Sequence, residues 1–465
     1  MRARPDILLV LADQLSASAL PAYGNRVVQA PRLERLGEEG IVFERALCAS
    51  PLCVPSRAAL MTGLLPSQTG AIDNAGELPA GFATFAHRLR LLGYRTVLAG
   101  KMHFIGADQL HGFEERPMTD VYPAGFDWIP DWDLADDERL PWYHNLSSVL
   151  RAGPVRSTLQ LEYDAEVVEC ALAALEDPDP RPLLLVVSFT HPHDPYEVPV
   201  EYWSRYEGVE VDAPASPEPC DDPVTRRLRS MVGSAPVSAD QTLAARRGYY
   251  GAISLVDDHL GTILDAAPEN TVVVFTSDHG DMLGERGLWY KMAPFEPSIR
   301  VPLIVHGLGS GRVAQPVSLL DLAPTLVALG GGSMEGVDLL DGDPPARDIP
   351  VEYLAEGVRA PQVTLVRGPL KLIRSLSEPD LVYDLEADQH ERVPVDAGSL
   401  GEAVSERWDL GRLDREVRAS QRRRRIVAQA LATGRVAKWD HPEGRRRYID
   451  TGDDFWSTLE RARRA

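Results

Sequence analysis

The chain has 465 residues, of which 44% are hydrophobic and 25% charged, a globular composition that excludes a chain disordered for lack of apolar residues. The formal net charge of -21 argues against broad nucleic-acid binding or docking on anionic lipid, but it allows a local cationic site for a small anion. Four cysteines make no disulfide framework, the N-terminal apolar run is too short for a signal peptide, and no stretch approaches the ~20 apolar residues of a membrane span, so we expect a cytoplasmic protein.

Four short apolar runs in the first two thirds of the chain end abruptly in polar residues. The runs lie at 7–12, 94–99, 183–189 and 271–275, and they are followed by Asp13-Gln14, Gly100-Lys101-Met102-His103, Thr190-His191-Pro192-His193-Asp194 and Thr276-Ser277-Asp278-His279-Gly280-Asp281. Continuous apolar runs are typical of strands buried on both faces of a parallel sheet. Helical patterns at 82–92, 163–175 and 243–266 precede the last three runs. This alternation predicts an α/β fold with a doubly wound, mostly parallel sheet.

The carboxyl ends of parallel strands meet at one edge of their sheet, and ligands of such folds bind beyond that edge. We therefore expect the polar residues that follow the four runs to form a single site.

The remaining segments are less regular. Residues 120–160 are rich in Trp, Tyr, Pro and Asp and predict a long irregular excursion, and residues 205–240 predict a second surface loop. Short runs at 363–366, 370–373 and 381–383 predict a small antiparallel sheet, and the chain beyond residue 402 is helical in pattern and rich in Arg. We expect a catalytic α/β domain at 1–345, a small antiparallel subdomain at 346–401 and a C-terminal extension at 402–465 that serves as an arm for oligomerisation and for the substrate pocket.

The C-terminal extension combines apolar residues with many Arg residues, which is a poor composition for an independent domain. Its candidate core anchors are Trp408, Ile426, Val427, Leu431, Trp439, Phe455 and Trp456. Arg and Trp are favoured at protein interfaces, so we expect an arm laid on a neighbouring subunit of a homo-oligomer, a dimer or a tetramer. The alternative is an arm folded onto its own subunit.

Cys53 lies between a predicted strand at 41–46 and a predicted helix at 58–61, in the segment Cys53-Val54-Pro55-Ser56-Arg57. A residue that opens a helix lies at the positive end of the helix dipole, and Arg57 adds positive charge, so we expect an acidified thiol. The alternative is a buried, inert cysteine. A phosphatase loop of the Cys-x5-Arg type is excluded, because position 59 is Ala59.

The run Cys-x-Pro-Ser-Arg, followed by Ala-Ala-Leu-Met-Thr-Gly, resembles the signature of type I sulfatases in the alkaline phosphatase superfamily. The resemblance continues through Gly100-Lys101-Met102-His103, Pro192-His193-Asp194-Pro195-Tyr196 and Ser277-Asp278-His279-Gly280-Asp281-Met282-Leu283-Gly284. In that family a separate formylglycine-generating enzyme converts the cysteine to formylglycine. The resemblance thus implies that Cys53 becomes a formylglycine nucleophile.

Several further stretches resemble choline-sulfatases within that family. They are Ser50-Pro51-Leu52-Cys53, Asp108 to Arg116, Trp142-Tyr143-His144-Asn145 and Gly287-Leu288-Trp289-Tyr290-Lys291. The resemblance implies hydrolysis of a small sulfate monoester, with choline sulfate as the first expectation.

A metal site is expected at the strand ends. Asp13 and Asp278 offer hard oxygen ligands that suit Ca²⁺, Mg²⁺ or Mn²⁺, and His279 adds a nitrogen. The family resemblance implies one divalent cation, Ca²⁺ before Mn²⁺ or Mg²⁺, held by these three residues and modified Cys53. Gln14 is either a carbonyl ligand or a substrate contact. The alternative for the carboxylates is helix capping by their side chains.

Catalytic roles also follow from the resemblance. Lys101 and Lys291 would hold the sulfate oxygens, and Arg57 would stabilise the aldehyde hydrate. His103 would orient or deprotonate a hydroxyl of that hydrate, which attacks sulfur, expels the alcohol and then collapses to release sulfate. His193 would protonate the leaving oxygen, with His191 as its rival for this role.

A quaternary ammonium group is best recognised by an aromatic face. Trp128, His144 and Asn74 occupy choline-sulfatase-like contexts, so we expect them to bind substrate, with loop packing as the alternative for Trp128. Choline-sulfatases also carry an acidic residue near the C-terminus, and this tail contains Asp450, Asp453 and Asp454. Two other functions stay open: a phosphonate monoester or phosphodiester hydrolase of the same superfamily, and a noncatalytic binding protein on the same fold.

Overall fold

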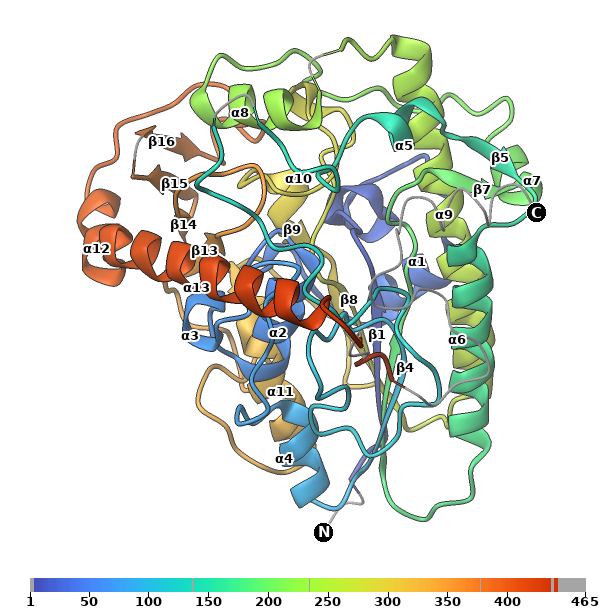
Figure 1. Cartoon of the computed structure of the whole chain (residues 1–465). Coiled ribbons are helices and arrows are strands. Elements are labelled where there is room, and N and C mark those ends of the chain that lie inside the picture. Colours follow the sequence, from blue (N-terminus) through green and yellow to red (C-terminus); the bar gives the residue numbers. More distant parts are fainter. Residues whose placement is uncertain (1–3, 136–137, 234, 377, 436–438, 442–465) are drawn as a thin grey trace.

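The computed structural model describes residues 4–135, 138–233, 235–376, 378–435 and 439–441 (Figure 1). Its centre is a seven-stranded sheet with the strand order β11-β2-β10-β8-β1-β6-β4. The bounds of these strands are β1 Ile7–Ala12, β2 Ile41–Phe43, β4 Arg95–Gly100, β6 Leu183–Ser188, β8 Val272–Ser277, β10 Leu303–His306 and β11 Gly311–Val313. Only β10 among them runs against its neighbours, β8 and β2, so the sheet is mostly parallel, as predicted.

The four predicted apolar runs are the adjacent strands β8, β1, β6 and β4, and all of their residues are buried. Leu9 of β1 lies opposite Val186 of β6 and Val274 of β8. Successive side chains of a strand point to opposite faces. Leu8 and Val10 accordingly join one hydrophobic core, and the flanking odd-numbered residues join a second core on the other face.

Helices cover both faces of the sheet (Figure 1). The first core includes α1 (Pro31–Glu39), α6 (Leu159–Glu176) and α9 (Ala239–Ala266). The second core includes α2 (Cys53–Thr62), α4 (Phe85–Leu91) and α11 (Leu322–Leu329). The predicted helices α4, α6 and α9 are thus present, and the last two are longer than their apolar patterns indicate. This arrangement is the predicted doubly wound α/β fold.

Some segments differ from the prediction. The expected strand at 41–46 divides between β2 and β3 (Ala46–Leu47), which pairs in a second small sheet with β9 (Arg300–Val301) and β12 (Val317–Ser318). The expected surface loop at 205–240 was wrong in part, because it contains α8 (Pro223–Val232). Asp222 caps this helix, since its Oδ1 accepts a hydrogen bond of 2.8 Å from the Thr225 N–H.

The remaining short elements lie mostly in loops. The described residues of the excursion at 120–160 are irregular as expected, apart from α5 (Ser147–Leu150), β5 (Gly153–Val155), which pairs with β7 (Glu197–Pro199), and the start of α6. The others are α3 (Pro66–Thr69), α7 (Val200–Ser204), α10 (Glu296–Ile299) and the 3₁₀ turns at 17–19, 21–23, 285–287 and 319–321. No helix among the described residues combines the length and apolar composition that a membrane span needs.

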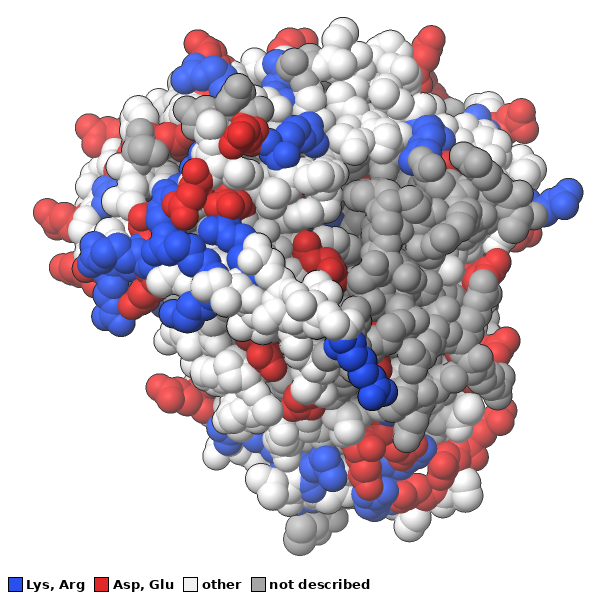
Figure 2. Space-filling view, in the orientation of Figure 1, with Lys and Arg blue, Asp and Glu red and all other residues white. Residues whose placement is uncertain are grey.

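The C-terminal part begins with the predicted antiparallel sheet, whose strands pair in sequence order. They are β13 (Ile349–Tyr353), β14 (Gln362–Arg367), β15 (Leu370–Ser375) and β16 (Glu378–Asp384). Two helices follow, α12 (Leu400–Arg407) and α13 (Leu410–Leu431). Lys and Arg side chains gather on the surface where these two helices lie (Figure 2).

The structure shows which of the expected core anchors in the C-terminal extension are buried within this chain. Helix α13 buries Leu413, Val417 and Gln421, one turn apart, against its own chain. Trp408 is buried as expected, whereas Ile426 and Val427 are 68% and 43% exposed within this single chain, so their role as anchors against a neighbouring subunit stays a prediction. They face away from the rest of the chain because Leu413, Val417 and Gln421 form the face of α13 that is buried. Phe455, Trp456 and the acidic tail residues lie outside the described residues.

Candidate active site

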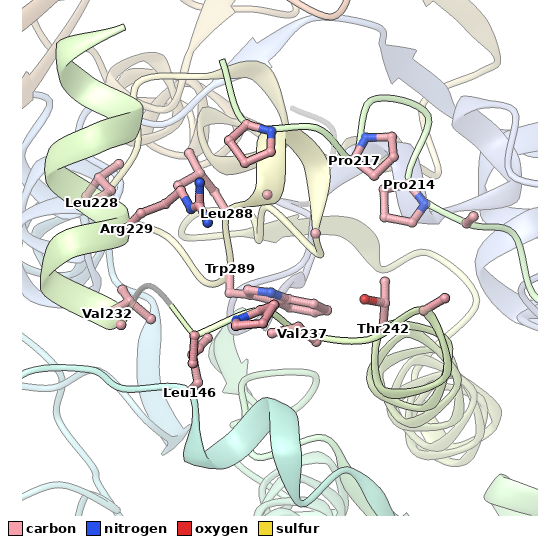
Figure 3. Close-up of a pocket in the computed structure, with 18 of the residues that line it drawn as sticks. Leu146, Pro214, Pro217, Leu228, Arg229, Val232, Val237, Thr242, Leu288 and Trp289 are labelled. Carbon is pink, nitrogen blue, oxygen red and sulfur yellow. The ribbon is translucent and has the colours of Figure 1, made fainter. Parts of the chain in front are cut away.

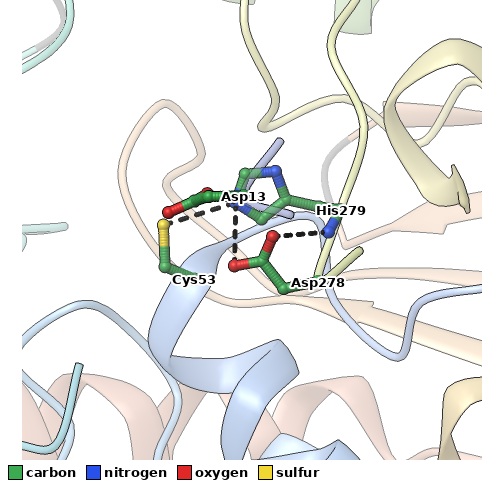
Figure 4. Close-up of side chains that lie close together, drawn as sticks. All are labelled: Asp13, Cys53, Asp278 and His279. Carbon is green, nitrogen blue, oxygen red and sulfur yellow. Dashed lines mark hydrogen bonds and ion pairs between the residues drawn. The ribbon is translucent and has the colours of Figure 1, made fainter. Parts of the chain in front are cut away.

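Residues that follow the parallel strands meet at one edge of the sheet, together with the N-terminus of α2. Asp13 follows β1, Asp278 and His279 follow β8, and Cys53 is the first residue of α2. Ligand atoms of these four buried residues all lie within 4.8 Å of one another (Figure 4). Lys101 follows β4 and also reaches this group, with its Nζ 3.6 Å from Cys53 Sγ.

Cys53 is fully buried in a place where its thiol is a poor nucleophile. Its Sγ lies 3.3 Å from His279 Nε2. Burial raises the pKa of the Cys53 thiol to about 12, although Lys291 and Arg57 act in the opposite direction. The expectation that the helix N-terminus and Arg57 acidify this thiol was therefore wrong, because the cost of desolvating a thiolate exceeds their attraction. The unmodified side chain is not set up for attack.

Buried cations balance the two carboxylates. Arg57 Nε donates to Asp278 Oδ2 at 2.8 Å, and Arg57 Nη2 lies 3.5 Å from Asp13 Oδ2. Lys101 Nζ donates to Asp13 Oδ2 as well. Burial alone would raise the pKa of Asp278, but Arg57, His279 and Lys101 together hold that pKa below its usual range. Burial lowers the pKa of Lys101 to about 7.

The donor set fits a divalent cation. Asp13 Oδ1 is buried and accepts no hydrogen bond from any residue in the described part of the chain. His279 Nε2 lies 3.7 Å from that oxygen, and its Nδ1 is 3.2 Å from the Gly280 carbonyl oxygen, to which it can donate. Burial lowers the pKa of His279 to about 3, so the ring is neutral and Nε2 keeps a lone pair. Two carboxylates, and a neutral imidazole whose other ring nitrogen is held by a backbone hydrogen bond, are common ligands of divalent metals.

Lys291 connects Gln14 to His193. Its Nζ donates to Gln14 Oε1 at 2.7 Å and to His193 Nε2. The amide nitrogen of Gln14 donates to Asp281 Oδ2 at 2.6 Å, so its carbonyl oxygen is held toward Lys291. Burial, and then Lys291 and Lys101, place the pKa of His193 well below its usual value. His193 is therefore neutral, and its Nδ1 donates to the Asp194 carbonyl at 2.7 Å.

His191 and His193 differ in what they face. His193 lines the pocket beside Cys53, whereas His191 is not among the residues that line it. The Nδ1 of His191 pairs with buried Asp164 at 2.7 Å, and this carboxylate also accepts a hydrogen bond from the Thr190 N–H. Of the two histidines, His193 has the position from which a ring nitrogen can reach a substrate.

A pocket with aromatic walls opens onto Cys53. It is lined by Cys53, Asn74, His103, Tyr122, Trp128, Trp142, His144, His193, Lys291 and Glu356. All three residues expected to bind the alcohol part of the substrate are present, at Asn74, Trp128 and His144. The ring of His103 lies 4.7 Å from that of Tyr122 and 5.5 Å from that of Trp128. Both ring nitrogens of His103 are buried without a hydrogen-bond partner in the described part of the chain.

Sequence reasoning missed Tyr122, Trp142 and above all Glu356 as pocket residues. Glu356 is 2% exposed. Its Oε1 pairs with His144 Nδ1 at 2.7 Å, and its Oε2 is buried with no hydrogen-bond partner among the described residues. The pocket thus combines aromatic faces with one carboxylate oxygen that no described residue satisfies. Glu356 lies shortly after β13. A polar residue that follows a strand was therefore the sequence feature that could have identified it as a pocket residue.

Lys291 also touches a second, larger cavity (Figure 3). This cavity lies between α8, the start of α9 and the loop that carries Lys291, and its walls are mostly apolar, including Leu146, Val232, Val237, Leu288 and Trp289. Apolar walls do not suit an anionic sulfate group. The pocket beside Cys53 is therefore the candidate substrate site.

Comparison with known families gives two matches that together span most of the chain. Residues 5–332 match the family model described as Sulfatase. Residues 415–464 match the model described as the C-terminal part of the choline sulfatase enzyme. The first match contains nearly all of the active-site residues described above, and the second contains the C-terminal half of α13.

Curated relatives include sulfatases, and solved structures share the fold. The chain is 40% identical to a choline-sulfatase of Rhizobium meliloti, with 94% of this chain and 93% of that protein covered. It is 28% identical to an arylsulfatase of Clostridium perfringens, with coverage of 73% and 78%. A phosphonate monoester hydrolase of Silicibacter pomeroyi is similar in fold, with a TM-score of 0.69, 20% identity and coverage of 92% and 97%.

Proposed function

This chain belongs to the sulfatase family, and from that premise we propose that it hydrolyses choline sulfate to choline and inorganic sulfate. The observation that carries the choice of substrate is the aromatic pocket beside Cys53, which contains the buried, half-satisfied carboxylate of Glu356. A quaternary ammonium group cannot donate a classical hydrogen bond, so it is held by aromatic faces and by a nearby negative charge. Trp128, Tyr122 and Glu356 offer both features.

We propose that Asp13, Asp278, His279 and modified Cys53 hold one divalent cation, with Ca²⁺ as the first expectation and Mn²⁺ or Mg²⁺ as alternatives. The cation would supply Lewis acidity to the sulfate ester, and formylglycine made from Cys53 would supply the nucleophilic oxygen. Conversion of Cys53 requires a formylglycine-generating enzyme as a partner. The high pKa of the unmodified thiol supports the need for this conversion.

The chain's own residues then have distinct tasks. Arg57 holds Asp278 and is close to Asp13, which limits repulsion between the carboxylates and an incoming sulfate group. Lys101, with its Nζ 3.6 Å from Cys53 Sγ, and Lys291, which lines the pocket beside Cys53, would hold the sulfate oxygens. His103 has two unpartnered ring nitrogens and can accept a proton from the nucleophile.

The Lys291–His193 pair supplies the proton for the leaving alcohol oxygen. Because neutral His193 accepts a hydrogen bond from Lys291, the two side chains share one proton at the point where the pocket meets Cys53. His193 is thus a relay within this pair and is not already protonated before substrate binds. Gln14 keeps Lys291 in place, with its carbonyl oxygen 2.7 Å from Nζ.

We also propose that residues 1–345 carry the chemistry, that 346–401 complete the substrate pocket, and that 402–465 contribute to a homo-oligomer, dimer or tetramer, in the cytoplasm. The Arg-rich surface of α12 and α13 supports an interface of this kind (Figure 2). Light scattering of the full-length protein at micromolar concentration tests this proposal. A monomer would contradict it.

The activity itself is tested by sulfate release from choline sulfate, measured beside a phosphate diester and a phosphonate monoester. We expect choline sulfate to have the highest kcat/KM, and a preference for either phosphorus ester would assign the phosphonate or diester hydrolase activity instead. Stoichiometric binding without sulfate release would identify a binding protein. Mass analysis should show the Cys53 peptide about 18 Da lighter than its thiol form, since SH₂ is replaced by O.

A further inference from the structure

Helix α13 contacts two segments that carry pocket residues, although none of its own residues lines the pocket. The contacts come from Gln421 and Arg424, which are three residues apart and so lie on one face of the helix. One contact leads toward Asn74 and the N-terminus of α2, and the other leads toward Glu356. Figure 1 shows α13 as the long helix that crosses the front of the molecule near α2 and β13.

The first contact is a buried ion pair. Both terminal nitrogens of Arg424 donate to the carboxylate of Asp73, each at 2.6 Å. The Asp73 side chain is 0% exposed and that of Arg424 is 12% exposed. A two-point guanidinium–carboxylate contact fixes orientation as well as distance. Asp73 Oδ1 also accepts a hydrogen bond of 3.0 Å from the Ala75 N–H, so the loop around Asn74 is held on both sides.

Asn74 in turn contacts α2, the helix that begins with Cys53. The N-cap residue of α2, Leu52, has no side chain that can accept a hydrogen bond. Asn74 Oδ1 accepts the Val54 N–H instead, at 3.1 Å. A helix N-terminus has free N–H groups that need such an acceptor. Asn74 therefore caps α2 from outside the helix while its side chain also lines the substrate pocket.

The second contact supports the opposite wall. Gln421 Oε1 accepts a hydrogen bond of 3.1 Å from the Trp132 N–H, and Trp132 Nε1 donates to the Ala355 carbonyl at 2.9 Å. Ala355 immediately precedes Glu356. Gln421 and Trp132 are both buried. Helix α13 is thus hydrogen-bonded to Asp73, the chain neighbour of Asn74, and through Trp132 to Ala355, the chain neighbour of Glu356.

We propose that Arg424 is a positioning residue for substrate binding, which acts through Asp73 to hold Asn74 and the pocket side of α2 in place. This inference deepens the proposed function, since the pocket is the one assigned above to the alcohol part of the substrate. The metal ligands Asp13, Asp278 and His279 follow β1 and β8, so their arrangement does not depend on α13, and Asn74 bonds the N–H of Val54 rather than the fourth ligand, Cys53, itself. Loss of the Arg424 contact should consequently affect substrate affinity more than the chemical step.

The competing explanation is that Arg424 only anchors α13. Breaking a buried ion pair by removing one partner leaves a buried charge and destabilises a protein, whereas removing both charges relieves that penalty. Stability and substrate affinity can therefore be separated. Arg424→Met leaves Asp73 charged and buried, and Arg424→Met combined with Asp73→Asn removes both charges while keeping an acceptor for the Ala75 N–H.

The experiment measures KM, kcat, melting temperature, metal content and Cys53 modification in these two variants of the full-length enzyme. Arg423→Met is the matched control, because Arg423 is exposed and has no ion pair within the described ranges. We expect Arg424→Met to raise KM about tenfold or more while kcat changes less than about threefold, with metal and modification unchanged. The double variant should regain thermal stability and keep the raised KM, and Arg424→Lys should recover part of the affinity.

Two results would overturn the proposal and show that Arg424 only anchors α13. One is an unchanged KM in Arg424→Met, and the other is a KM that returns to the wild-type value together with the melting temperature in the double variant. If Arg424→Met does not fold, the double variant alone decides between these outcomes. All values are also measured with 4-nitrophenyl sulfate. The positioning role can thus be read from that ester even if choline sulfate is not a substrate, which keeps a failure of the proposed function distinct from a failure of this inference.

Discussion

Two halves of the candidate active site are constructed in different ways. The charged half takes Asp13, Lys101 and Asp278 from the ends of three strands in one parallel sheet. The aromatic half takes Trp128 and His144 from an irregular excursion, and Glu356 from the region after β13 in a separate sheet. The charged half is therefore positioned by a continuous ladder of backbone hydrogen bonds, and the aromatic half by individual side-chain contacts such as Gln421 with Trp132.

The difference indicates how the two halves can change. A parallel sheet with both faces covered tolerates little movement, so the charged half is suited to a chemical step that every substrate of the enzyme shares. Loops held by a few side-chain contacts can be altered without disturbing the sheet. We infer that sulfate chemistry resides in the charged half and substrate choice in the aromatic half.

Replacement of Cys53 should have the largest effect and should not distinguish between substrates. Cys53→Ala removes the residue that becomes the nucleophile, so turnover of both choline sulfate and 4-nitrophenyl sulfate should fall by at least about 10⁴-fold. Cys170→Ala, on the half-buried Cys170 of α6, is the control and should keep full activity. Substantial sulfate release by Cys53→Ala would remove Cys53 from the mechanism.

Loss of a metal ligand should also affect both substrates. Asp278→Asn removes a negative ligand and the partner of Arg57, so we expect metal affinity to fall by at least about 100-fold and turnover to fall with it. Elemental analysis and kinetics on the same samples test this expectation. Asp281→Asn should retain the metal, because Asp281 bonds Gln14 and Tyr196 and is outside the ligand cluster. Full activity of verified metal-free enzyme would refute the metal site.

Changes in the aromatic half should instead lower kcat/KM more for a substrate with a cationic alcohol part than for one with an uncharged alcohol part. Trp128→Ala removes a cation–π contact of about 1–2 kcal/mol, so kcat/KM for choline sulfate should fall about 5- to 30-fold, with little change for a sulfate ester whose alcohol part is uncharged. Glu356→Gln should act in the same direction, because it removes the nearby negative charge. Trp203→Phe is the control, since that ring stacks on Arg247 away from the pocket. Equal losses on esters with cationic and with uncharged alcohol parts would assign Trp128 to packing.

The smallest expected effect concerns the C-terminal part away from the pocket. Trp408 Nε1 donates to Glu352 Oε1 at 2.7 Å, and both side chains are buried. Trp408→Phe leaves that carboxylate oxygen without this donor and should lower the free energy of unfolding by about 1–3 kcal/mol. Denaturant unfolding measures the loss. KM should stay unchanged, and a raised KM would mean that α12 also supports the substrate site.

The sequence alone predicts the sheet and the charged half of the site well, for a physical reason. Strands buried on both faces leave continuous apolar runs, and their polar ends, such as Asp13 and Asp278, must meet at one edge. Glu356 was missed because its role depends on how a second sheet packs against the first, and no local pattern records that packing. The expected acidity of Cys53 was wrong for a related reason, since burial is a property of the folded chain.

Two further features of the fold depend on tertiary contacts that local patterns do not record. Helix α8 was not predicted, because the many Pro, Ser and Asp residues around it in the sequence are typical of a loop. Ile426 and Val427 resemble core residues in the sequence, yet α13 buries the face that carries Leu413, Val417 and Gln421, so that both are exposed within this single chain. Apolar character indicates burial only together with the rest of a helix face.

The most direct test of the central claim compares the wild-type enzyme on choline sulfate and on 3,3-dimethylbutyl sulfate, an ester of the same shape whose alcohol part is uncharged because carbon replaces the ammonium nitrogen. Both esters present the same sulfate group to the charged half, so the ratio of their kcat/KM values, once corrected for the better leaving group that the ammonium makes of choline, reports on the aromatic half. We predict that choline sulfate is preferred by about tenfold or more, because its cation gains contacts with aromatic faces and Glu356 in a desolvated pocket. Equal values, or a preference for 3,3-dimethylbutyl sulfate, would contradict the account.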